Sequence, residues 1–151
     1  MTRFKKFWAL SGADKITFMV ALCGLPGVYL NLRRFGFKNY LARLQHIPLA
    51  AMPPDIETSS VPAQISYLVN SAARLLFRRE ACLERSILLW SLLRRRGIES
   101  ELKIGVAAED GTMRAHAWVE IDGEAVNEQP LVNEKFAAFD STFTAEYRDF
   151  S

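Results

Sequence analysis

The stretch that decides the fold is ACLERSILLWSLLRRRG, residues 81–97. Strong helix formers fill it, three arginines crowd its last turn, and Gly97 stands where a helix commonly ends in a left-handed glycine. Its apolar positions cover nearly the whole circumference, which is typical of a helix buried on all sides. We therefore predict a central helix here, with the rest of the chain packed around it.

Downstream of this helix the hydrophobic period changes to two. Leu102, Ile104 and Val106 alternate with polar or small residues, and residues 115–121 alternate again before an Asp-Gly pair at 122–123. That pair is typical of a tight hairpin turn, so a third segment is expected to return beside the second. Helices followed by at least three antiparallel strands indicate the α+β class, with the central helix packed on a small sheet.

Upstream, the sequence divides into parts. Residues 47–62 hold four of the six prolines, which is typical of a linker. We predict an N-terminal helical region over residues 1–46, a Pro-rich linker over 47–62, and a compact core over 63–151.

The N-terminal region carries a mostly apolar run, Ile16–Leu30. We expect a helix capped by Ser11 or Asp14, broken near Pro26 and resumed over residues 40–44, which together make a helical hairpin. The run is shorter than the roughly 18–20 apolar residues of a spanning helix, and glycine and proline interrupt it. Membrane contact is therefore not expected, and we expect a cytoplasmic protein.

Composition excludes several classes of site. The two cysteines, Cys23 and Cys82, are too few for a disulfide scaffold or a four-cysteine zinc site, and there are only two histidines. These low counts make a metal site unexpected. No glycine-rich phosphate loop is present, so no cofactor is expected either. Residues 1–50 carry eight Lys or Arg and one acidic residue, but no basic-aromatic motif, so nucleic acid is not an expected partner. Cys23 is expected to be buried and inert.

Cys82 begins the predicted central helix. Unpaired backbone N–H groups and the positive end of the helix dipole stabilise a thiolate there, and Arg85 adds a positive charge one turn on. A buried structural cysteine is the alternative interpretation.

His116 makes the nucleophile interpretation stronger. In a strand, His116, Trp118 and Glu120 share one face, and the opposite face is wholly apolar. We expect the apolar face to pack on the core and His116 to reach the helix end that carries Cys82. A cysteine at a helix start and a histidine facing it are a nucleophile and its base.

A third group should hold the imidazole by its other nitrogen, and the returning strand offers Asn127, Glu128 and Gln129. With an ideal two-residue loop, Glu128 falls on the face opposite His116. One bulge at Gly123 would bring it onto the His116 face. Periodicity leaves both possibilities open.

The ordered motifs CLERS (82–86), LLRRRGI (92–98), IGV (104–106), AHAWVE (115–120), DG (122–123) and NE (127–128) resemble a known family. They are similar to the transglutaminase-like cysteine proteases of lasso-peptide biosynthesis, the B-type leader peptidases in their stand-alone form. The resemblance spans roughly residues 65–140. It implies a papain-like core with Cys82 as nucleophile, His116 as base and Glu128 as third member. The family more often has Asp there, which keeps Asn127 as the alternative.

The resemblance also implies a function and partners. The family cuts a ribosomally made precursor peptide between leader and core, and a separate small protein binds the leader in the stand-alone form. The ATP-dependent macrolactam cyclase that closes the freed core is a further candidate partner. The basic N-terminal region is a candidate docking surface. A transglutaminase-like acyl transferase, a non-catalytic binding domain of the same fold and a membrane-attached regulator built on Ile16–Leu30 are the alternatives.

Overall fold

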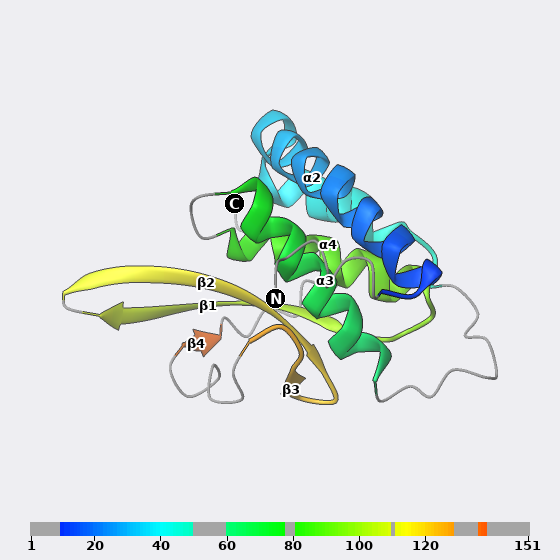
Figure 1. The fold of residues 1–151 in the computed structure, drawn as a ribbon. Coiled ribbons are helices and arrows are strands. Elements are labelled where there is room, and N and C mark those ends of the chain that lie inside the picture. The colour runs from blue at the N-terminus through cyan, green and yellow to red at the C-terminus, as the bar shows by residue number, and fades with distance from the viewer. Residues whose placement is uncertain (1–9, 50–59, 78–80, 110, 129–135, 139–151) are drawn as a thin grey trace.

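The computed structural model describes residues 10–49, 60–77, 81–109, 111–128 and 136–138. In chain order its elements are α2 (Gly12–Gln45), α3 (Val61–Leu76), α4 (Cys82–Arg95), β1 (Glu101–Glu109), β2 (Thr112–Ile121), β3 (Glu124–Ala125) and β4 (Ala137–Ala138). The strands form one antiparallel sheet in the order β3-β2-β1-β4. Helices precede strands (Figure 1), which confirms the predicted α+β class.

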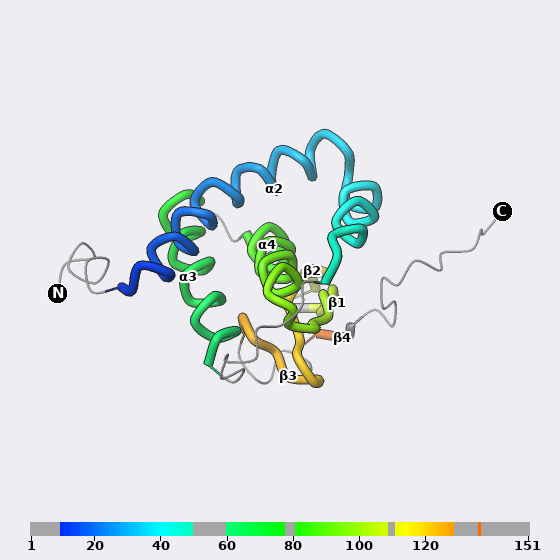
Figure 2. Tube along the Cα trace, turned by 90° about the vertical axis from the view of Figure 1, so that its right-hand side faces the viewer, coloured from blue at the N-terminus to red at the C-terminus, as the bar shows by residue number. Residues whose placement is uncertain are grey.

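Helix α4 is the centre of the molecule. Viewed almost along its axis in Figure 2, it has α2 arching over it, α3 beside it and the strands on its remaining side. Its apolar side chains are buried all round the helix, as predicted: Ile87, Leu88, Leu89, Trp90, Leu92 and Leu93. Burial on every side follows from the apolar circumference of the sequence.

The end of α4 is also where the sequence predicts it. Gly97 takes a φ of 75°, the left-handed conformation that glycine adopts without a steric penalty. The N–H groups of Gly97 and Ile98 donate to the carbonyls of Arg94 and Leu93, both at 3.0 Å. These paired bonds and the burial of Leu93 beside Ile98 complete a Schellman motif.

Helix α2 departs from the prediction at its break. Ser11 caps it, its hydroxyl oxygen accepting from the Asp14 N–H at 3.1 Å, but Pro26 lies inside continuous helix. The helix is interrupted instead at Gly36, whose φ is 73°. Burial of Leu25 and Val28 on either side holds the helix together through the proline, although the proline has no N–H to donate. The predicted break near Pro26 is therefore wrong, and Gly36 makes the bend.

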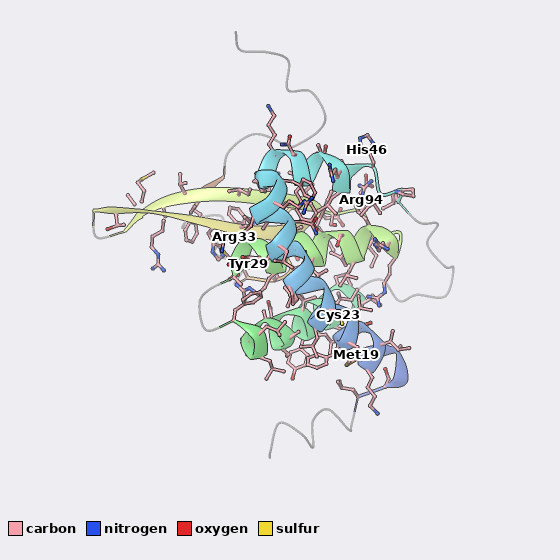
Figure 3. All side chains as sticks on the ribbon, turned by 90° about the horizontal axis from the view of Figure 1, so that it is seen from above. Met19, Cys23, Tyr29, Arg33, His46 and Arg94 are labelled. Carbon is pink, nitrogen blue, oxygen red and sulfur yellow. The ribbon has the colours of Figure 1, made fainter. Side chains whose placement is uncertain are left out.

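The outer face of α2 is apolar although it is exposed. Ile16, Met19, Val20 and Leu30 expose between 44% and 68% of their surface, while Ala21, Leu25 and Val28 on the inner side are buried. Met19 and Cys23 lie along this helix in the view from above (Figure 3). Cys23 is exposed, so its predicted burial is wrong. A helix that is apolar on both sides buries only one of them when a single layer of protein covers it.

By length and composition α2 is also the described helix that could cross a membrane, with 22% of its most apolar window buried. Core helices of soluble proteins and signal sequences meet the same criteria.

Two arginines at the end of α4 connect it to the N-terminal region. Arg94 Nη2 donates to the carbonyl of Ile47 at 3.1 Å, and Arg96 Nη2 donates to Thr17 Oγ1 at 2.7 Å. Core residues of α2 belong to the same buried cluster as those of α3 and α4. Most of the predicted linker lies outside the described residues, and the three-part division of the chain stays a prediction.

Strands β1 and β2 form a long hairpin. The inner end of β2 lies against α4 and is buried from residue 117 to 120, while residues 112–115 at its outer end are exposed and project beyond the helices (Figure 1). The next turn, between β2 and β3, is a two-residue loop. Asp122 and Gly123 take φ values of 51° and 82°, and Ile121 pairs directly with Glu124. The register is therefore the ideal one, without a bulge at Gly123.

Candidate active site

Cys82 is the first residue of α4. The side chain of Ala81, at the preceding cap position, makes no capping hydrogen bond, and the first intrahelical bond runs from the Arg85 N–H to the Ala81 carbonyl at 3.0 Å. The N–H groups of the first turn have no partner within the helix, so the positive end of the helix dipole lies beside the thiol. The side chain of Cys82 is half-buried between α4 and the sheet.

His116 reaches this helix end from β2. Its side chain is hydrogen-bonded to Cys82, and its Nε2 lies 3.2 Å from Glu128 Oε1. Because Nε2 faces the carboxylate, the bond to Cys82 is assigned to Nδ1. Cysteine, imidazole and carboxylate therefore stand in a row, in the order that a nucleophile, its base and the base's orienting group require.

Glu128 reaches His116 by a backbone path that neither of the two predicted registers includes. After Ala125 the chain leaves the strand, and Val126 keeps only one ladder bond, from its N–H to the Val119 carbonyl at 2.9 Å. The other bond goes to a side chain, because Asn127 Oδ1 accepts the Val119 N–H at 2.8 Å. The proposed bulge at Gly123 is thus wrong. The departure occurs at residues 126–128, where the Asn127 amide replaces the main-chain acceptor and Glu128 turns toward His116.

A second cation holds Glu128 in place. Arg85 Nη2 lies 3.3 Å from the same Oε1 atom that faces His116, and its Nη1 donates to Asn70 Oδ1 at 3.2 Å. The chain of contacts therefore runs from Asn70 on α3 through Arg85 and Glu128 to His116. Asn127, by contrast, bonds to the Val119 N–H and to Ser86 Oγ instead of to the imidazole. Gln129 lies outside the described residues.

Two aromatic rings flank the imidazole. The Phe136 ring lies 4.9 Å from it at 26°, and Trp118 lies 6.3 Å from it at 21°. Trp118 was expected beside His116, and it is fully buried, with its Nε1 donating to Glu120 Oε1 at 2.7 Å. The Trp118–Glu120 face of β2 is thus buried like the apolar one. Phe136 was missed, because a single Phe in a segment without periodicity gives no signal in the sequence.

The pKa values of the pair move in opposite directions. Burial raises the pKa of the Cys82 thiol. The hydrogen bonds from His116 and the Ala117 N–H, with the charges of His116 and Arg85, more than offset this and lower it below its ordinary value. The hydrogen bonds to Cys82 and Glu128 raise the pKa of His116 to about 9, against the opposing effect of burial. A low thiol pKa beside a high imidazole pKa favours the thiolate–imidazolium pair at neutral pH.

The described residues contain no group of three or more His, Cys, Asp or Glu side chains that could hold a metal ion. A hollow of about 500 Å³ is lined by Arg43, His46, Ile47, Pro48 and Arg95. Arg95 ends the helix that Cys82 begins, so roughly 20 Å separates this hollow from the thiol, and we assign it no part in the chemistry.

Comparison with protein families matches residues 25–140 to the transglutaminase-like superfamily. No curated protein and no solved structure matches the chain. The matched range covers more than half of the sequence and includes Cys82, His116 and Glu128. This superfamily includes cysteine peptidases and acyltransferases. The fold and the match agree with the expectation drawn from the motifs, and the chain belongs to the transglutaminase-like superfamily.

Proposed function

We propose that this protein is a cysteine peptidase that removes the leader from a ribosomally made lasso-peptide precursor. The observation that carries the peptidase proposal is the row of Cys82, His116 and Glu128 at the start of a buried helix. The choice of precursor rests on the ordered motifs over residues 65–140 and their resemblance to the stand-alone leader peptidases. The reaction is proposed to take place in the cytoplasm.

In the first half of the proposed reaction the Cys82 thiolate attacks the scissile carbonyl carbon, forming a C–S bond and an oxyanion. The backbone N–H of Cys82 at the helix start is placed to donate to that oxyanion. Collapse breaks the C–N bond, and the imidazolium of His116 gives its proton to the leaving amine of the core peptide. The product is a thioester of the leader with Cys82.

In the second half, neutral His116 takes a proton from water while the hydroxide attacks the thioester carbonyl. The C–S bond breaks, the leader leaves as a carboxylic acid, and the thiolate–imidazolium pair is regenerated. Glu128 holds the imidazolium throughout and is not required to take up a proton.

The direct test is incubation of purified protein with precursor peptide, with and without the leader-binding protein, followed by mass spectrometry. We expect a single cut between leader and core that disappears in Cys82→Ala and His116→Ala proteins. Cleavage that persists in the Cys82→Ala protein would refute the peptidase. Transfer of the leader to an added amine, with no hydrolysis, would instead show an acyl transferase. Leader binding without either reaction would show a binding domain.

The separate leader-binding protein is proposed to dock on the outer face of α2. This face combines exposed apolar side chains at helical spacing, including Ile16, Met19 and Leu30, with Arg33 and Arg34, which are exposed just beyond them. A partner helix with an apolar face and acidic edges fits such a surface. The cyclase remains a second proposed partner, without an assigned surface.

The docking proposal predicts that an Ile16→Ser/Met19→Ser variant loses the stimulation of cleavage by the partner and keeps its alkylation rate at Cys82. A Met113→Ser change on the distant, exposed end of β2 is the control. Stimulation that survives in the α2 variant would refute this surface. Sedimentation of the parent protein with anionic vesicles, lost in the variant, would show that the face binds lipid instead.

A further inference from the structure

We propose that Ser86 and Asn127 form a buried latch that positions the backbone of Ala117 against the thiolate of Cys82. The name Ser86–Asn127 latch is used below for these two side chains and their hydrogen bonds to β2. The inference rests on the proposed function only in taking Cys82 as the nucleophile.

The latch is a continuous set of short hydrogen bonds beneath the thiol. Ser86 is fully buried and lies four residues after Cys82, on the same face of α4. Its hydroxyl donates to the Ala117 carbonyl at 2.8 Å and accepts from Asn127 Nδ2 at 2.9 Å. Asn127, 8% exposed, completes the set with its bond from the Val119 N–H at 2.8 Å.

The consequence for catalysis comes from the second backbone group of Ala117, its N–H. Its backbone N–H donates to the Cys82 sulfur and lowers the pKa of that thiol. Both polar groups of this residue are therefore held by α4, the N–H by Cys82 and the carbonyl by Ser86. His116 is the preceding residue, so the same contacts fix the point from which the imidazole projects.

The N–H and carbonyl of Ala117 are available to α4 because β3 is short. Val119 and Ala117 present their N–H and C=O groups to the same edge of β2, since they are two residues apart. Val126 pairs with Val119, but the chain has turned away before it can pair with Ala117. Side chains of α4 therefore bond to this open edge of β2, where another strand would otherwise pair. Asn127, which ends the pairing, is therefore both the terminator of β3 and half of the latch.

Neither latch side chain touches the position of the reacting atoms, so both are positioning residues. Ser91 provides a matched comparison within the same helix. It is also a buried serine on α4, but its hydroxyl donates to the Leu88 carbonyl of its own helix at 2.8 Å. Removing the Ser91 hydroxyl costs one buried hydrogen bond within α4, whereas removing the Ser86 hydroxyl costs the two bonds that connect α4 to Ala117 and Asn127. Only the loss at Ser86 should therefore change the environment of the thiolate.

The test measures the pH dependence of iodoacetamide alkylation at Cys82, which needs no peptide substrate. All proteins carry Cys23→Ala, because Cys23 is exposed and would react as well. In the Ser86→Ala protein we expect the alkylation midpoint to rise by about one pH unit, because a loosened N–H stabilises the thiolate less. In the Ser91→Ala protein we expect the midpoint of the parent. Cleavage of precursor by Ser86→Ala should lose about tenfold in kcat with little change in KM.

A folded Ser86→Ala protein with the parent midpoint would overturn the latch, as would equal shifts in Ser86→Ala and Ser91→Ala. If Ser86→Ala does not fold, the protein with only Cys23 replaced still answers the question by NMR. Its Ala117 amide signal should titrate with the same midpoint as Cys82 alkylation, and an amide that does not respond would overturn the proposal. A shifted alkylation profile in a protein that cuts no precursor would sustain the latch and reject the peptidase.

Discussion

Replacing Glu128 by glutamine should lower the pKa of His116 by about one to two pH units from its value of about 9. Glutamine keeps the shape of the side chain and an oxygen that can accept from Nε2, so the change removes the negative charge alone. The carboxylate lies 3.2 Å from Nε2, and both side chains are mostly buried, at 16% and 22% exposure.

The magnitude follows from this contact. A hydrogen bond to a charged partner contributes about 1.5–3 kcal/mol, and one pKa unit corresponds to about 1.4 kcal/mol. Arg85 should increase the fall in the pKa of His116, because its Nη2 lies 3.3 Å from the same oxygen. In the Glu128→Gln protein its charge would face the imidazolium without a carboxylate between them. We therefore expect the upper half of the range.

The assay is NMR titration of the histidine ring carbons. The chain has only two histidines, and a His46→Gln protein assigns the remaining signal to His116. A pKa that stays within a few tenths of about 9 in the Glu128→Gln protein would refute the role of the carboxylate. A Cys82→Ser protein is the companion measurement. It removes the largest contribution to the raised pKa and should lower it even with Glu128 intact.

Three further predictions concern stability. Because folding raises the pKa of His116 from about 6.5 to about 9, its contribution is complete below about pH 6.5 and is lost as the pH rises through about 9. The lowered thiol pKa of Cys82 acts in the opposite direction, because its contribution to stability grows as the pH rises toward the ordinary thiol value of about 8.5. It therefore reduces, between about pH 6.5 and 9, the fall in the free energy of unfolding in urea that His116 produces. A His116→Asn protein with the same fall would contradict this. Asn127→Ala should lower the free energy of unfolding by about 1–3 kcal/mol, because it leaves buried groups unpaired; urea denaturation checks this, and an unchanged midpoint would count against it. Gly36→Ala should lower the thermal midpoint, because its φ is positive, and Gly27→Ala should raise it, because an added Cβ meets open space in mid-helix; the reverse order would show that the bend is misassigned.

The parts of the fold that could be predicted are those set by local signals. The buried circumference of α4 and its end at Gly97 follow from residues within the segment itself. The meeting of Cys82 and His116 could also be anticipated, because a helix start and the polar face of a strand are each readable from a few neighbouring residues. Their pairing in space needed only that the helix packs on the sheet, as an α+β chain of this length must.

Features decided by packing could not be predicted. Pro26 is a strong breaker in isolation, but buried neighbours hold the helix through it, and the bend falls at Gly36, which takes a positive φ without a steric penalty. Cys23 lies in an apolar run, and this pattern predicts burial. Only one side of α2 is covered by protein, however, and Cys23 is exposed on the other side. In both cases the outcome depends on which side of α2 is covered by α3 and α4, and these helices lie far away in the sequence.

The third member of the site shows most clearly what periodicity omits. Both registers considered for the returning strand assumed that main chain pairs with main chain as far as Glu128. Had the ladder continued in the observed register, Glu128 would stand opposite Ala117, its side chain on the face away from His116. Its main chain would also take the Ala117 N–H and carbonyl away from Cys82 and Ser86. Instead, the side-chain oxygen of Asn127 takes the place of the Val126 carbonyl as acceptor of the Val119 N–H. The chain therefore leaves the ladder, the Glu128 carboxylate turns toward the imidazole, and the Ala117 N–H stays available to the thiolate. On this argument the reactivity of Cys82 depends on where β3 stops, and a change that extends the ladder as far as an Ala117–Glu128 pair should abolish both contacts together.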